Sequence, residues 1–204
     1  MKKIFNFQFS IFNFKSGFTV LESIVAIAVV SLAIAGAFSA VGTGLSSAIQ
    51  AKEETKAYYL AQEALEIIRN KRDANILDKL INGAAVTWRS GISENASDPC
   101  FPGKTCKVDA TGPGIPPVYL TECSASGNLW DVCPVLTQDP NTYLYSYSGS
   151  LATIFNREIQ IENISNVVNG VPQITEIAVT IRISWQHAGM PKEFKTKTIL
   201  TNWF

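Results

Sequence analysis

Glu22 has the clearest chemical consequence of any residue in the sequence, because it is an isolated charge at the start of a long apolar run. No ionisable side chain occurs from Ser23 to Ala51. A charge held at membrane depth costs on the order of 2.5 to 3.5 kcal/mol on insertion scales. An acid here therefore needs a partner of opposite charge, or a route to the polar headgroups, which long side chains near helix ends reach by snorkelling.

The four cysteines are the second set of residues whose chemistry is informative, because they can form disulfides or bind a metal. They lie in loop-like sequence rich in Pro, Gly and Ser, and an even number of cysteines in an exported domain favours disulfides. Of the three possible pairings we favour the sequential one, because short loops close most readily. It joins Cys100 to Cys106 and Cys123 to Cys133. A zinc site is the alternative, but neither spacing is that of a zinc knuckle and the single histidine, His187, is remote in sequence.

A catalytic site is not indicated by any motif. An enzyme needs a nucleophile, a base and an electrophile that converge, or a cluster of metal ligands. The sequence contains no Gly-x-Ser-x-Gly, no Gly-x-x-x-x-Gly-Lys-Ser/Thr and no His-x-x-x-His. We expect His187 to be a surface or capping residue, and Asp131, Glu158 and Glu162 to be solvated charges. The sequence thus predicts no enzyme, cofactor or metal. The alternative is a membrane-anchored or secreted extracellular domain with an enzymatic or ligand-binding role.

The N-terminal residues 1–17 have the character of a cytoplasmic leader. They contain three lysines and no acid, so the positive-inside rule keeps this end in the cytoplasm and places the C-terminal part outside. The uncharged run that follows exceeds the roughly 20 residues that a bilayer requires. We therefore expect a transmembrane helix over 18–45. A conventional secretory signal is the alternative, since Ala33–Ala35 and Ala35–Ala37 fit the small-x-small cleavage pattern.

Length and composition limit the kind of domain that the residues after the membrane helix can form. A chain of 204 residues with 47% hydrophobic content supplies a membrane helix and one modest globular domain. The formal net charge is zero, and without the three leader lysines 14 basic residues (17 minus 3) face 17 acidic ones. We predict no nucleic-acid partner, because proteins that bind nucleic acid usually carry a basic face.

The helix is expected to continue beyond the membrane as an amphipathic spine over 18–72. No proline occurs between Phe18 and Asp98. Apolar residues recur at spacings of three and four, while charged residues occupy the other faces, as in a helix with one buried face. The apolar stripe consists of Ala57, Leu60, Ala61, Ala64, Leu65 and Ile68.

The C-terminal residues 151–204 are predicted to form an antiparallel sheet. Apolar and polar residues alternate strictly over 176–186, and similar alternation occurs over 155–162. Turn residues separate these runs from each other and from a third run over 193–203. A meander that covers the apolar helix stripe gives an α+β fold. Residues 73–150 are expected to be a disulfide-containing connecting region with short elements, including a strand over 143–147.

The segment from Gly17 to Glu22, Gly-Phe-Thr-Val-Leu-Glu, resembles the signal peptide of type IV pilins and type II secretion pseudopilins. The resemblance implies that a prepilin peptidase cleaves between Gly17 and Phe18 and methylates the new amine of Phe18. It also implies that Glu22 is the residue that determines assembly. Residues 60–66 and 69–73 are most similar to V-type minor pilins and I-type pseudopilins. The chain departs from many pilins in placing all its cysteines before the sheet.

This resemblance implies a location and a set of partners. The protein would cross the cytoplasmic (inner) membrane once, with its C-terminal domain outside, and then enter a surface pilus or a pseudopilus. The expected partners are other pilin subunits through helix–helix packing, the prepilin peptidase, an inner-membrane platform protein, an assembly ATPase and membrane lipid. Cleavage would create a cationic amine on Phe18 about one helical turn from Glu22, so that two charges costly in lipid can neutralise each other.

Overall fold

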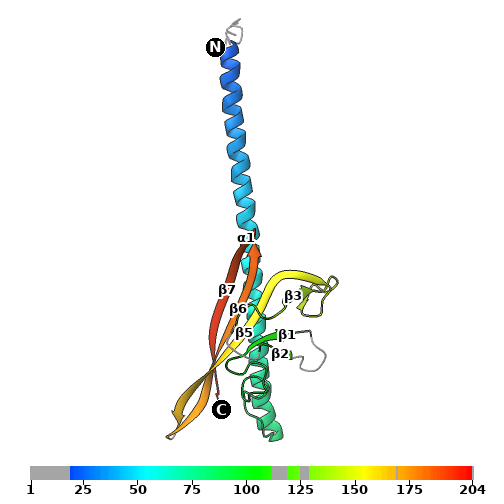
Figure 1. Cartoon of the computed structure of the whole chain (residues 1–204), viewed down its shortest axis with the longest axis vertical. Helices are drawn as coiled ribbons and strands as arrows, with labels where there is room; N and C mark the ends of the chain where they lie inside the picture. The colour runs from blue at the N-terminus through cyan, green and yellow to red at the C-terminus, as the bar shows by residue number, and fades with distance from the viewer. Residues whose placement is uncertain (1–18, 112–118, 125–128, 169, 204) are drawn as a thin grey trace, which may run out of the picture. The chain divides into compact units, whose positions relative to one another are not determined.

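The computed structural model describes residues 19–111, 119–124, 129–168 and 170–203. These residues form one long helix, α1 (Val20–Asn82), and seven strands (Figure 1). The strands are β1 (Thr105–Asp109), β2 (Tyr119–Ser124), β3 (Val135–Gln138), β4 (Tyr145–Ser146), β5 (Leu151–Val168), β6 (Val171–His187) and β7 (Met190–Thr201). The chain divides into two compact units, residues 1–49 and 50–204.

In the first unit, α1 is apolar on all sides. The most apolar window of the helix has a mean hydropathy of 2.5, and none of that window is buried within the chain. Val20 and Phe38, for example, are 78% and 74% exposed. The helix is long and apolar enough to cross a membrane, and a signal sequence near the N-terminus has the same character.

The helix continues beyond Arg72, where the sequence pattern led us to expect its end. It stops at Asn82, and Gly83 follows with a φ of 64°. A glycine in this left-handed conformation is a common helix terminator because it has no Cβ to clash. The additional turns carry Asn75 and Ile76 into the core, so tertiary packing holds a segment that we had assigned to the connecting region.

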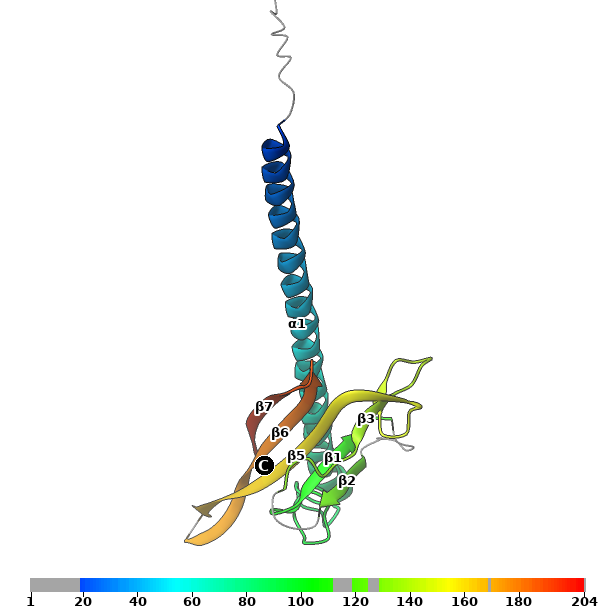
Figure 2. The ribbon, with the colours of Figure 1, turned by 45° about the horizontal axis from the view of Figure 1, so that its top comes forward.

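The second unit contains a single seven-stranded antiparallel sheet (Figure 2). Strands β5, β6 and β7 form the predicted meander, with Ile159 opposite Ile181 and Val179 opposite Thr198. The other side of β5 pairs with β3 near its start and with β1 near Ile159. Residues 73–150 therefore do more than connect helix to meander, because they supply four strands of the same sheet.

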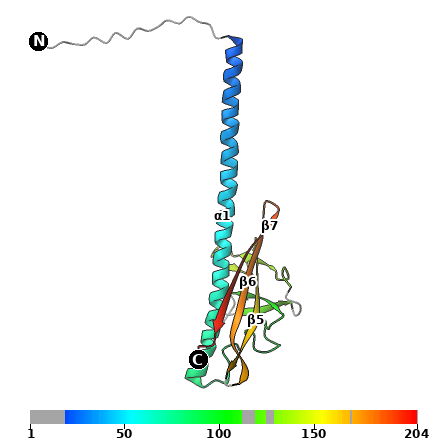
Figure 3. The ribbon, with the colours of Figure 1, turned by 90° about the vertical axis from the view of Figure 1, so that its left-hand side faces the viewer.

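The core lies between the sheet and the C-terminal half of α1, which Figure 3 shows beside β5, β6 and β7. The predicted helix stripe is buried, except that Leu65 is only partly covered. The opposing residues come from the alternating positions of β5 and β6. They are Phe155, Ile159, Ile161, Ile177, Val179, Ile181, Ile183 and Trp185. The predicted α+β architecture, a long N-terminal helix packed on a C-terminal antiparallel sheet, is confirmed.

Two disulfides tie the first strands to their flanking loops. Cys100 is bonded to Cys106 and Cys123 to Cys133, with Cα–Cα distances of 5.2 and 5.1 Å. This is the sequential pairing. Disulfides are typical of domains that fold in oxidising compartments, which favours an extracytoplasmic location for this unit.

Candidate functional site

Glu22 lies in the first turn of α1, and Thr19 caps that turn. The backbone amide of Glu22 donates a hydrogen bond of 3.3 Å to Thr19 Oγ1, and the hydroxyl of Ser23 donates to the Thr19 carbonyl at 3.3 Å. A threonine followed three residues later by glutamate is the capping-box pattern. A negative charge in the first turn also interacts favourably with the helix dipole. The cap explains why the helix begins at Val20.

The carboxylate of Glu22 is exposed and surrounded by uncovered apolar side chains. Its neighbours Leu21 and Ile24 are 73% and 59% exposed. Within the described ranges, no Lys, Arg or His side chain lies at salt-bridge distance from this carboxylate. The predicted cleavage and methylation residues, Gly17 and Phe18, lie outside the described residues. The site thus offers one acid, in an apolar setting, to a cation from elsewhere.

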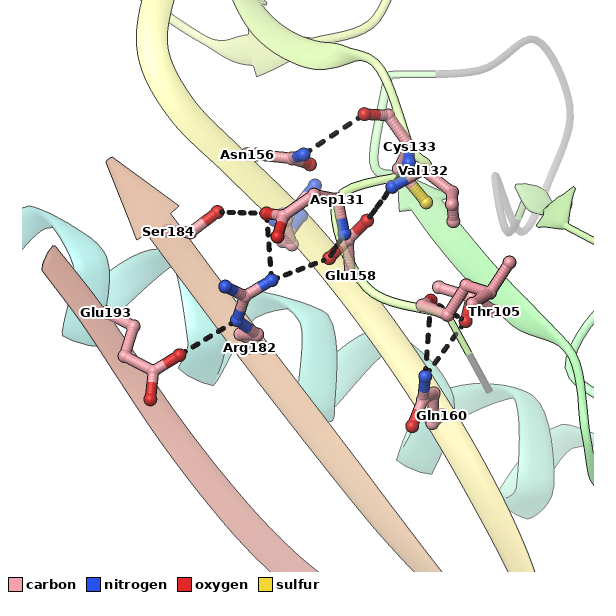
Figure 4. Close-up of polar contacts among 12 residues, drawn as sticks. Thr105, Asp131, Val132, Cys133, Asn156, Glu158, Gln160, Arg182, Ser184 and Glu193 are labelled. Carbon is pink, nitrogen blue, oxygen red and sulfur yellow. Dashed lines mark hydrogen bonds and ion pairs between the residues drawn. The ribbon is translucent and has the colours of Figure 1, made fainter. Parts of the chain in front are cut away.

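A second polar site lies in the head domain, where Glu158 of β5 binds the loop that precedes β3 (Figure 4). Its carboxylate accepts backbone N–H hydrogen bonds from Asp131 at 2.8 Å, Val132 at 2.7 Å and Cys133 at 3.0 Å. We expected Glu158 to be solvated, and that prediction is wrong because the loop covers it completely. Glu162 and Asp131 are exposed, as predicted.

Arg182 of β6 completes this polar cluster (Figure 4). Its guanidinium contacts Asp131 at 2.8 Å, Glu158 at 3.4 Å and Glu193 at 2.9 Å. Burial alone would lower the pKa of Arg182, but the acids outweigh it and raise the pKa above its ordinary value. Since three carboxylates already engage this cation, the cluster is a structural clasp and not an acid–base pair suited to catalysis.

Arg157 is a fully buried cation on the helix-facing side of β5. It pairs with Glu63 and donates to the backbone carbonyl of Leu60 at 3.2 Å, both on α1. It also donates to the carbonyl of Val108 in β1 at 2.7 Å. One side chain therefore links the helix to two strands.

His187 is buried, and the expectation that it is a surface or capping residue is wrong. Its Nδ1 lies 2.9 Å from Glu53 Oε2 on α1, and the same oxygen accepts a hydrogen bond of 3.2 Å from Trp185 Nε1. This contact fastens the end of β6 to the helix. In the described part of the chain, no group of three or more His, Cys, Asp or Glu side chains is placed to hold a metal ion.

We expect Glu158→Ala to destabilise the head domain by about 2 to 4 kcal/mol, because three backbone amides and Arg182 lose a buried acceptor. Urea unfolding of the full chain in detergent, followed by tryptophan fluorescence, measures this. Glu162→Ala is the matched control on the same strand, because Glu162 forms an exposed pair with Lys197. Replacing Glu162 should lower the free energy of unfolding by less than about 0.5 kcal/mol. Equal midpoints for the two variants would show that the Glu158 clasp contributes nothing.

The fold and the exposed apolar helix define a class: an α+β protein of pilin-like architecture, with a long apolar N-terminal helix packed on a C-terminal antiparallel sheet. Scans against protein-family models, curated proteins and solved structures each returned no match to this chain.

Proposed function

We propose that this protein is a structural subunit of a type IV pilus or a secretion pseudopilus, assembled through its N-terminal helix. The observation that carries the proposal is the first half of α1, which is apolar on every side, uncovered within the chain and marked by a single acid in its first turn. Such a surface is stable in lipid or against other helices of the same kind.

The proposed mechanism begins with processing. A prepilin peptidase cleaves after Gly17 and methylates the amine of Phe18, which stays cationic. In lipid this amine and the Glu22 carboxylate are each costly when alone. Glu22 of an incoming subunit pairs with the Phe18 amine of a subunit already in the fibre, so that desolvation enforces the register between neighbouring helices.

During assembly the helix leaves the membrane and enters the fibre, and the head domain, which is already outside, moves with it. Two disulfides and the buried Arg157 contacts hold it together in an oxidising compartment. The chain itself carries no machinery for the work of assembly in this proposal. A platform protein and a cytoplasmic ATPase supply that work, and other pilins supply the contacts within the fibre.

Analysis of the mature N-terminus tests the proposal most directly. In cells with an active prepilin peptidase, mass spectrometry of the purified protein should find a chain that starts at N-methylated Phe18. A start near Phe38 would identify a conventional secreted protein, and an intact Met1 would identify a simple membrane-anchored one. Either result contradicts the pilin proposal. The same cells without the peptidase are the control, and should retain residues 1–17.

A further inference from the structure

The last turns of α1 and the loop after them enclose a hollow of about 470 Å³ that none of the contacts above explains. Its floor is formed by the buried Ile76 and Trp88. Leu80 of α1, which is 55% exposed, and Ile174 of β6 line it as well. In Figure 3 this end of α1 lies beside the end of the described chain, and Asn202 also borders the hollow. Ligand pockets commonly have this size and an apolar lining.

The wall of the hollow is held in place without a ligand. Asn75, which is only 7% exposed, donates its side-chain amide to the backbone carbonyls of Trp88 at 3.3 Å and Ser90 at 2.8 Å. Gly83 turns the chain sharply after the helix, and its positive φ suits glycine. The Trp88 backbone is therefore fixed against α1 and its side chain packs in the core, which lowers the entropic cost of binding a ligand beside it.

Two cations, Lys79 and Arg89, border the hollow. In the part of the chain that the structure describes, neither forms a salt bridge, and the hydrogen bonds of the Arg89 Nη1 go to a backbone carbonyl and a side-chain amide. Glu94 and Asp98 act on Arg89 electrostatically, but burial outweighs them and lowers the pKa of Arg89 below its ordinary value. The Asp98 carboxylate is itself bound by two backbone amides. The positive charges of Lys79 and Arg89 are thus only partly neutralised by nearby acids.

We propose that this hollow binds an apolar ring or short alkyl group that carries a carboxylate. The apolar part contacts Trp88, Leu80 and Ile174, and the carboxylate lies between Arg89 and Lys79. Charge complementarity favours this occupant over a neutral one, and among the residues that the structure describes no acid lines the hollow to oppose it. Such a group occurs in a free aromatic or aliphatic acid and at the C-terminus of a peptide that ends in an apolar residue. The inference does not depend on processing or on fibre assembly.

The probe for this site is 3-phenylpropionate, added to the ¹⁵N-labelled full chain in detergent micelles. The indole N–H resonance of Trp88, identified with a Trp88→Phe variant, should shift in a saturable way with a Kd on the order of 1 to 10 mM, as for a small fragment. The neutral analogue 3-phenylpropanol should bind at least about tenfold more weakly, since it lacks the charge. The other three tryptophans report any general effect of the medium.

Variants at the two cations separate the electrostatic contribution to binding from the apolar contribution. Arg89→Gln and Lys79→Gln should each weaken 3-phenylpropionate binding by roughly fivefold or more. Arg69→Gln, a cation of the same helix that pairs with Glu66 and does not line the hollow, should leave it unchanged. Equal affinity for the acid and the alcohol, no saturable shift of Trp88, or equal loss in all three variants would overturn the proposal.

A peptide arm of the same experiment identifies the source of the ligand. Acetyl-Gly-Gly-Phe with a free carboxylate is compared with its C-terminal amide. Binding of this acid at least about tenfold tighter than 3-phenylpropionate supports a peptide C-terminus as the ligand, because added contacts must offset the added ordering cost. Binding of 3-phenylpropionate alone supports a free acid. If the amide binds as well as the acid, the carboxylate is not recognised and the proposal fails.

Discussion

Glu22→Gln is expected to leave the protein processed and inserted in the membrane but to reduce its incorporation into filaments by roughly 100-fold. The reason is electrostatic: without the carboxylate, the Phe18 amine of the neighbouring subunit stays unpaired in lipid, at a cost of about 3 kcal/mol. The measurement is the ratio of protein in sheared filaments to protein in the membrane fraction, determined by quantitative immunoblotting.

The choice of glutamine separates the charge of Glu22 from the capacity of residue 22 to complete a capping box. Glutamine at this position keeps the capping-box pattern, and Thr19 Oγ1 can still accept the backbone amide of residue 22. Glu22→Leu removes both the charge and the capping group. If charge pairing governs assembly, both variants fail equally. If Glu22→Gln assembles normally and Glu22→Leu does not, the residue acts through the cap and the pairing mechanism is refuted.

Arg157→Met is expected to lower the free energy of unfolding of the head domain by about 3 kcal/mol. The substitution removes a buried donor from the Val108 and Leu60 carbonyls, while Glu63, at 36% side-chain exposure, turns to water. We discount the ion pair itself for that exposure. Urea unfolding of the full chain in detergent is the measurement, with the Trp fluorescence midpoint as readout.

A double-mutant cycle tests whether Arg157 acts through Glu63 or through the carbonyls. If the carbonyls dominate, Glu63→Gln costs little, and adding it to Arg157→Met changes the midpoint little further. Arg69→Met is the control on the same helix, where an exposed pair with Glu66 should be worth less than about 0.5 kcal/mol. An Arg157→Met variant that unfolds at the same urea concentration as the parent would contradict the assigned role.

The elements with strong local periodicity could be predicted from the sequence. The stripe from Ala57 to Ile68 has helical spacing, and β6 alternates strictly, so each pattern specified one buried face before any partner was known. Packing the two faces together then gave the α+β order. The cysteine pairing followed from short sequence separations, which need no knowledge of the fold.

The polar contacts could not be predicted in this way, because they join residues far apart in sequence. Glu158 occupies an outward position of β5, and only the loop with Asp131 makes that position buried. His187 meets Glu53 across a separation of 134 residues. Arg157 is different, because it lies between Phe155 and Ile159 among the inward-facing positions of β5. The alternation of its neighbours in the sequence therefore already indicated that its side chain faces the core.

The helix end shows the limit of a periodicity argument. Beyond Arg72 the pattern gives no sharp boundary, and Gly83 is the residue that ends α1. The turn with Asn75 and Ile76 is stabilised by the loop that returns along it, so its helical state depends on contacts made later in the chain. Local propensity is overridden here by tertiary packing.

The hydrogen bond from the Cys133 amide to Glu158 has a consequence for the disulfide that Cys133 forms. In the native fold the Cys133 amide donates to Glu158 on β5, Arg182 of β6 contacts the same carboxylate, and Cys133 is bonded to Cys123. Pairing of β5 with β6 therefore supports the position that Cys133 holds in this crosslink. A buried carboxylate in this way couples the geometry of a disulfide to the pairing of two strands.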